Sequence, residues 1–247
     1  GNLPAMMAEL YGKGTGCAKG KAGSMHLVDN KAMVLGTSAV VGTGIGNATG
    51  YAYALKYQRS PNVVVCFFGD GATEEGVFYE SMNFAALKQL PILYICENNF
   101  YAIHTHQTKR QAVPKIASRA AAMGVPAEVM SDDVLKLAER VAGALSSIRD
   151  GSGPQLLECQ CYRLKEHVGP SEDFKMGYRH AEEAVPWRAN DPVGQIAKLL
   201  PEAARSAIHQ QVEAQVAAAI DFAETSPWPP PEELMRDVYQ VAGASHA

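Results

Sequence analysis

Two short runs of consecutive apolar residues stand out in the hydrophobic pattern of the first half of the chain. They occupy residues 63–68 and 92–96, and between them apolar residues recur at helical spacing up to Lys88. Apolar runs of this length are typical of strands buried on both faces of a parallel sheet. Glu74 and Glu75 suit the first turn of the intervening helix, because the N-terminal end of a helix dipole favours negative charge. The pattern therefore predicts a βαβ unit.

The rest of the pattern predicts more helices, another strand and a long loop. Helices are expected at 42–57, 115–123 and 132–149, a strand at 155–161, a polar loop at 165–180, and a helical pattern from 191 to 225. Strands alternating with helices indicate an α/β fold built on a mainly parallel sheet with helices on both faces. The predicted organisation is one α/β module over residues 1–190 and a helical C-terminal extension over residues 191–247.

Composition narrows the function classes. The chain has 247 residues, of which 47% are hydrophobic, and a formal net charge of -4. No basic run interleaved with aromatic residues points to a nucleic acid. No apolar stretch approaches the about 18 residues that span a bilayer, so a soluble protein is expected. The five cysteines show neither zinc spacing nor a disulfide framework, which favours a reducing compartment.

The first residue is Gly1 rather than methionine, which leaves open a leader sequence removed upstream. A cytoplasmic location is predicted, and an organellar matrix stays open for that reason.

Polar residues follow each strand of the predicted βαβ unit. Asp70 stands between Gly69 and Gly71 after the first strand, and Asn99 comes directly after the second. In a right-handed βαβ unit both strands point the same way, so Asp70 and Asn99 emerge at the carboxyl edge of the sheet, where such sheets bind ligands. With a backbone carbonyl from the following turn, these oxygens suit a magnesium ion.

The glycines of this motif are explained by backbone geometry rather than by metal binding. Gly71 lets the backbone approach a phosphate closely, and amides around Ala72 point outward at the start of the following helix. An isolated Gly-Asp-Gly is more often an ordinary tight turn. The strand before each half, the helix between them and Asn98-Asn99 at the second edge favour a metal-diphosphate site.

These motifs resemble those of thiamine-diphosphate enzymes, and specifically the alpha subunit of the decarboxylating first component of 2-oxo acid dehydrogenase complexes. Gly-Asp-Gly followed by Asn-Asn is similar to the family's magnesium and diphosphate motif. Further similar segments are residues 20–26 (GKAGSMH), 97–103 (ENNFYAI), Tyr162-Arg163 with His167 and Asp173, and 227–234 (PWPPPEEL). The resemblance runs nearly from end to end and implies the thiamine-diphosphate-binding fold.

The resemblance also implies a role for individual residues. It implies that the magnesium ligands are the side chains of Asp70 and Asn99 and the Tyr101 carbonyl. The implied active-site histidine is His167, which is also among the implied cofactor contacts. The other implied cofactor contacts are Ala39, Val41, Gly69, Gly71, Ala72, Asn99 and Tyr101. The family usually has glycine at the position of Ala39. The serine that kinases modify in some relatives is absent beside His167.

The activity implied is that of a pyruvate, branched-chain or acetoin dehydrogenase. Such an enzyme decarboxylates a 2-oxo acid on thiamine diphosphate and passes the acyl group to a lipoyl group on an acyltransferase component. The carboxylate that activates the cofactor comes from a beta subunit in this family, so a heterotetramer is expected. Alternatives are another transketolase-like subunit, or a non-catalytic scaffold of the same fold.

A dinucleotide-binding site is the main rival for the glycine-rich stretch at 42–46. It fails because no acidic residue occurs from 31 to 69 to bind a ribose hydroxyl. The histidines at 26, 104 and 106 are either site residues or ordinary solvated loop residues. Tyr162 and Arg163 either hold the loop or cap a strand end.

Overall fold

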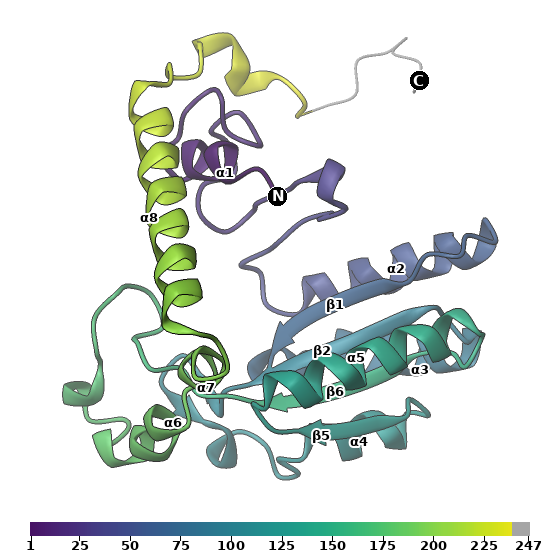
Figure 1. Cartoon of the computed structure of the whole chain (residues 1–247). Helices are drawn as coiled ribbons and strands as arrows, with labels where there is room; N and C mark the ends of the chain where they lie inside the picture. Colours follow the sequence, from purple (N-terminus) through teal and green to yellow (C-terminus); the bar gives the residue numbers. More distant parts are fainter. Residues whose placement is uncertain (239–247) are drawn as a thin grey trace, which may run out of the picture. The chain divides into compact units, whose positions relative to one another are not determined.

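Four parallel strands form the sheet on which the predicted site lies. In the computed structural model, which describes residues 1–238, they stand in the order β1-β2-β6-β5 (Figure 1). The strands are β1 (Val64–Gly69), β2 (Ile92–Asn98), β5 (Ala127–Met130) and β6 (Gln155–Gln160). A small antiparallel pair, β3 (Tyr101–Ala102) and β4 (Thr105–His106), follows β2. The mainly parallel sheet that the sequence predicted is confirmed.

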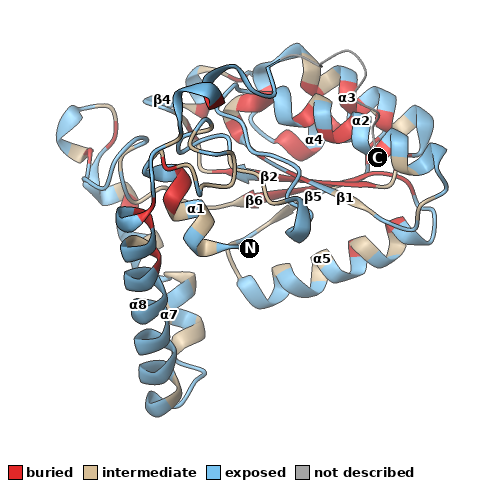
Figure 2. Cartoon of the chain, turned by 90° about the horizontal axis from the view of Figure 1, so that it is seen from above, coloured by how far each residue is buried: buried red, intermediate tan, exposed pale blue. Residues whose placement is uncertain are grey.

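Helices cover both faces of this sheet, as predicted. On one face lie α2 (Thr43–Tyr57), α3 (Gly76–Lys88) and α4 (Ile116–Ala122), and on the other lies α5 (Val134–Arg149). Strand β2 shows the division, because Tyr94 packs with the three-helix face while Leu93 packs with α5. Buried residues accordingly concentrate on the central strands and on the helix faces turned toward them (Figure 2).

By contacts the chain divides into two compact units. One comprises Val40–Leu199, which holds the sheet, and the other comprises Gly1–Ala39 together with the residues from Leu200 onward. In the second, α1 (Leu3–Leu10) packs against α8 (Glu202–Thr225), which places a chain end on the helical C-terminal segment. The two units differ from the predicted module of residues 1–190, because residues 1–39 group with the C-terminal segment, and the packing of α1 against α8 was not predicted. Residues 239–247 of the predicted extension lie outside the described residues.

The remaining elements are short. They are α6 (Val185–Ala189), α7 (Pro192–Ala197) and the 3-10 helices η1 (Asn30–Ala32), η2 (Asp70–Glu74), η3 (Gln107–Lys109), η4 (Phe174–Met176), η5 (Ala181–Ala184) and η6 (Pro231–Met235). Among the described residues no helix is both long and apolar enough to cross a membrane. All five cysteines are free thiols.

Three local predictions need correction. Glu74 and Glu75 are not in the first turn of a helix: Glu74 ends η2, and Glu75 is the N-cap of α3. The helical pattern from 191 is broken before α8, where Pro201 is the N-cap and cannot donate a backbone hydrogen bond. Strand β5 was missed, because its four residues are too short to show a pattern.

Candidate active site

The strand register brings the two halves of the predicted motif together. Gly69 of β1 is paired with Glu97 of β2, so Asp70 and Asn99 both leave the sheet at its carboxyl edge. Asp70 begins η2, and Asn99 begins the turn that leads into β3. The structure therefore places these side chains at one edge, as the βαβ pattern predicted.

The two carboxylate oxygens of Asp70 have different surroundings. The residue is 1% exposed, and its Oδ2 forms an ion pair with Arg110 Nη2 at 2.5 Å. Oδ1 is buried and has no hydrogen-bond partner. A buried charged oxygen without a partner costs free energy, which a bound cation would recover. Within residues 1–238 no three His, Cys, Asp or Glu side chains form a metal-binding group.

The two asparagines at the end of β2 form different contacts. Asn98 is 1% exposed, and its amide donates to Glu158 Oε1 at 2.7 Å, which ties the end of β2 to β6. Asn99 is half-buried, and its Oδ1 accepts one hydrogen bond, from the Tyr101 amide at 3.0 Å. An amide oxygen has two lone pairs, so Asn99 keeps one for a ligand. Phe100 adopts a left-handed φ of 69°, which turns the chain back toward the site.

Three side chains from the segment after β4 clamp the turn that carries Asp70. Arg110 pairs with Asp70 and Glu74, and Gln111 Nε2 donates to the Asp70 carbonyl at 3.2 Å. Arg119 donates to Thr73 Oγ1 at 2.7 Å. The sequence pattern missed this clamp, because its members lie 40 or so positions from the residues they hold and belong to no motif.

Gly71 has a steric reason that the sequence did not reveal. A Cβ on Gly71 would lie 3.0 Å from Ala102 Cβ, closer than side-chain carbons normally approach. Ala72 is buried in the core beside it, whereas a Cβ on Gly69 would meet nothing within 4 Å. Gly71 thus allows η2 to lie directly against β3, and so brings Asp70 to the Tyr101 turn.

A buried arginine fastens the loop after β6. Arg179 is 1% exposed and donates to Asp173 Oδ1 from Nε at 2.8 Å, and to the Arg163 and Lys165 carbonyls. Burial on its own would raise the pKa of Asp173, but hydrogen bonds from Tyr178 and Arg179 bring it below its ordinary value. The carboxylate therefore stays charged and keeps this end of the loop in place.

Arg163 contacts the turn after β2 and has N–H groups that form no hydrogen bond. Its Nη2 donates to the Ile103 carbonyl at 2.9 Å and to the Tyr178 hydroxyl at 3.0 Å. Its Nε and Nη1 are buried and form no hydrogen bond, although Nη1 is 3.8 Å from Asp173. Arg163 therefore holds the loop, one of its two predicted roles, and also has N–H groups that suit an anion.

His167 lies in the exposed part of the same loop. Partial desolvation lowers its pKa from the ordinary value, and the nearby Arg163 and His104 lower it further. His104 contacts the Tyr178 ring at 4.6 Å between centroids, while His106 contacts Tyr101 at 5.0 Å. The histidines at 104 and 106 thus face the loop and the turn rather than open solvent alone.

Two predicted contacts lie before α2. Val41 is 58% exposed in the sheet-bearing unit, just before Gly42, whose φ of 85° begins α2. Ala39 and His26 belong to the other compact unit. The site geometry is therefore described by the sheet edge and the two loops alone.

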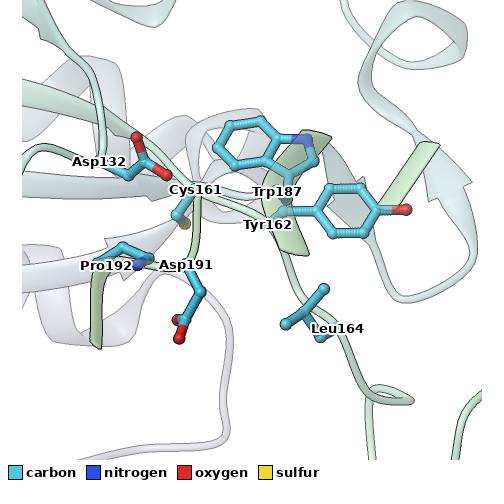
Figure 3. A pocket seen from close by; sticks show the side chains of 7 residues that line it. All are labelled: Asp132, Cys161, Tyr162, Leu164, Trp187, Asp191 and Pro192. Atoms are coloured by element: carbon cyan, nitrogen blue, oxygen red, sulfur yellow. The ribbon is translucent and has the colours of Figure 1, made fainter. Parts of the chain in front are cut away.

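A separate pocket of about 120 Å³ opens beyond the ends of β5 and β6 (Figure 3). It is lined by Asp132, Cys161, Tyr162, Leu164, Trp187, Asp191 and Pro192. This volume is below the about 300 Å³ of the smallest common ligand pockets. None of the predicted cofactor residues lines it, and burial raises the pKa of the Cys161 thiol to about 12, so that thiol is unreactive.

Known proteins resemble this chain over most of its length. The profile of the dehydrogenase E1 component family matches residues 1–232. The chain belongs to this family. It is 39% identical over 244 residues to the alpha subunit of acetoin:2,6-dichlorophenolindophenol oxidoreductase of Bacillus subtilis, and the match covers 96% of this chain and 72% of that protein.

A second relative supports the same family. The chain is 37% identical to the chloroplastic pyruvate dehydrogenase E1 component subunit alpha-3 of Arabidopsis thaliana, over 95% of this chain and 57% of that protein. Within the E1 family the chain is of the alpha-subunit type. Among solved structures, a thiamin diphosphate-dependent enzyme from Mycobacterium smegmatis matches with a TM-score of 0.42 and 24% identity, over 53% of this chain and 24% of that one.

Proposed function

We propose that this chain is the alpha subunit of a thiamine-diphosphate-dependent 2-oxo acid or acetoin dehydrogenase, and that it binds the cofactor's diphosphate through Mg²⁺. The observation that carries the proposal is the Asp70 carboxylate, buried at the carboxyl edge of the sheet with one oxygen lacking any partner. Membership of the E1 family makes this edge the expected place for the cofactor. The residues present fit the group.

The Mg²⁺ ligands in this proposal are oxygens, as this ion requires. Asp70 Oδ1 supplies the negative charge, Asn99 Oδ1 a neutral oxygen, and the Tyr101 backbone carbonyl the third protein ligand. The hydrogen bond of 3.0 Å from the Tyr101 amide to Asn99 Oδ1 supports this set, because it holds the Asn99 side chain against the backbone of the residue that carries the carbonyl.

The diphosphate lies, in this proposal, against the turn that starts at Asp70. Gly71 and Ala72 bring their backbone close to it, and Arg163 offers the N–H groups of Nε and Nη1, which form no hydrogen bond within the chain, to the anion. Gly69 precedes the turn, and Val41, just before α2, is assigned to the aminopyrimidine ring. Since N–H groups form charge-assisted hydrogen bonds with phosphate, the turn and the arginine together compensate its charge.

Thiamine diphosphate, when bound, supplies the nucleophilic carbon that attacks the substrate carbonyl and takes up the electrons released with carbon dioxide. His167 has a lowered pKa and is therefore neutral near pH 7, able to donate one hydrogen bond and accept another. We assign it to positioning the substrate or the incoming lipoyl group. The beta subunit and a lipoyl-bearing acyltransferase complete the proposed assembly, and the cytoplasm remains the predicted location.

Replacement of Asp70 tests the proposal. Asp70→Asn keeps the shape but removes the only anionic protein ligand, so affinity for thiamine diphosphate with Mg²⁺ should fall at least about tenfold, or about 1.4 kcal/mol. Isothermal titration calorimetry on the alpha–beta complex measures it. Asp150→Asn, an exposed aspartate after α5, is the matched control and should bind normally. Equal affinities in wild type and Asp70→Asn would refute the metal site at Asp70, and a wild type that binds no cofactor would favour the scaffold alternative.

A further inference from the structure

Arg110 makes the two oxygens of Asp70 unequal. Its side chain is 9% exposed, and its guanidinium reaches Asp70 Oδ2 with Nη2 and Glu74 with Nη1. Asp70 Oδ1 takes no part in this pair and has no hydrogen-bond partner. The guanidinium therefore occupies one oxygen of the predicted metal ligand and leaves the other for a cation.

We infer that Arg110 is a positioning residue that sets the metal preference of this site, by holding Asp70 to a single ligand oxygen. The inference rests on the proposed function and adds a residue that belongs to none of the sequence motifs. Arg110 acts on the ion only through Asp70.

The preference follows from the coordination chemistry of the two common divalent ions. Mg²⁺ requires a nearly ideal octahedron, in which a carboxylate fits best with one oxygen. Ca²⁺ accepts six to eight oxygens in flexible geometry, including both oxygens of one carboxylate. A carboxylate whose second oxygen is held by an arginine thus suits Mg²⁺. The same carboxylate without the arginine has both oxygens free and therefore suits Ca²⁺ better.

The positive charge of Arg110 works against any cation nearby, which is the competing effect. It is offset within the structure, because the same guanidinium pairs with Glu74 as well as Asp70. Charge alone would also change Mg²⁺ and Ca²⁺ binding in the same direction and by similar amounts. The ratio of the two affinities therefore separates the geometric effect from the electrostatic one.

The experiment compares Arg110→Met with the wild-type alpha–beta complex. Apparent affinity for thiamine diphosphate is measured by calorimetry in saturating and limiting Mg²⁺, and then in Ca²⁺. We expect the Mg²⁺ half-saturation concentration to rise about tenfold or more, as losses of hydrogen-bond partners to metal ligands do. The half-saturation concentration for Ca²⁺ should change less, so the Mg²⁺/Ca²⁺ preference falls.

Three further variants fix the interpretation. Arg149→Met removes an exposed arginine at the end of α5 and should leave both half-saturation concentrations unchanged. Arg119→Met loosens the same turn through Thr73 without touching the Asp70 carboxylate, so it should weaken both ions alike. Arg110→Lys retains the charge but contacts fewer oxygens, and its Mg²⁺/Ca²⁺ ratio should be intermediate.

Parallel losses for Mg²⁺ and Ca²⁺ in Arg110→Met, or no loss, would overturn the inference. If Arg110→Met does not fold, Arg110→Lys alone tests the inference. A wild-type Mg²⁺/Ca²⁺ ratio in Arg110→Lys would then overturn it as well. Asp70→Asn in the same assay separates the two proposals. If it binds both ions normally, the metal site itself is wrong, whereas if only the Arg110 variants are normal, the proposed function stands without this role.

Discussion

His167 shows how loop neighbours tune a single side chain. Desolvation, Arg163 and His104 all lower its pKa below the ordinary value of 6.5. The folded state thus binds a proton less tightly than the unfolded chain. The contribution of His167 to stability is therefore unfavourable once the pH falls below about 6.5, and it is absent at higher pH. Since the pKa shift is downward, the neutral imidazole is the form present at neutral pH.

We predict that His167 titrates below 6.5, measured by NMR of its ring protons with His167→Asn for assignment. Arg163→Met removes one of the positive charges and should raise the midpoint, while Arg188→Met, at an exposed pair with Glu172, should not. A midpoint at or above the ordinary value in the wild type would contradict the assignment of a neutral His167.

At the scale of elements, the βαβ core was predictable because each strand is a continuous apolar run between clear breaks. Pro91 and the polar residues after each strand set its ends, and the register then follows from parallel pairing. The clamp of Arg110, Gln111 and Arg119 was not predictable. The clamp depends on which residues of a later segment contact η2 in the folded chain. A single arginine in a loop is not part of any periodic pattern, so the sequence does not indicate this contact.

The close contact between η2 and β3 predicts that alanine at Gly71 and alanine at Gly69 have different effects on stability. Gly71→Ala forces a methyl group to 3.0 Å from Ala102, so the turn must shift and stability should fall by about 1–3 kcal/mol. Gly69→Ala adds the same methyl group where nothing lies within 4 Å and at an extended backbone, φ -81°. Urea unfolding of both variants measures the difference. Similar stabilities would mean that the close approach is not required.

At the scale of the whole molecule, the described site offers half of what the proposed chemistry needs. The sheet edge provides ligands for a metal and an anion, through Asp70, Asn99 and Arg163. The cofactor's aminopyrimidine requires a carboxylate against a ring nitrogen, and no residue of this sequence matches the family's glutamate. Such a carboxylate needs a desolvated setting to hold its proton, and an interface between subunits supplies one.

We therefore predict that the purified chain shows no 2-oxo acid decarboxylation above background, and that adding the beta subunit produces activity. A panel of 2-oxo acids and acetoin, assayed with a dye acceptor, measures this and identifies the substrate. Asp70→Asn mixed with the beta subunit is the control, because it keeps the partner but lacks the metal ligand, and it should stay inactive. Turnover by the isolated wild-type chain, lost in isolated Asp70→Asn, would place a complete active site in this chain and refute the two-subunit proposal.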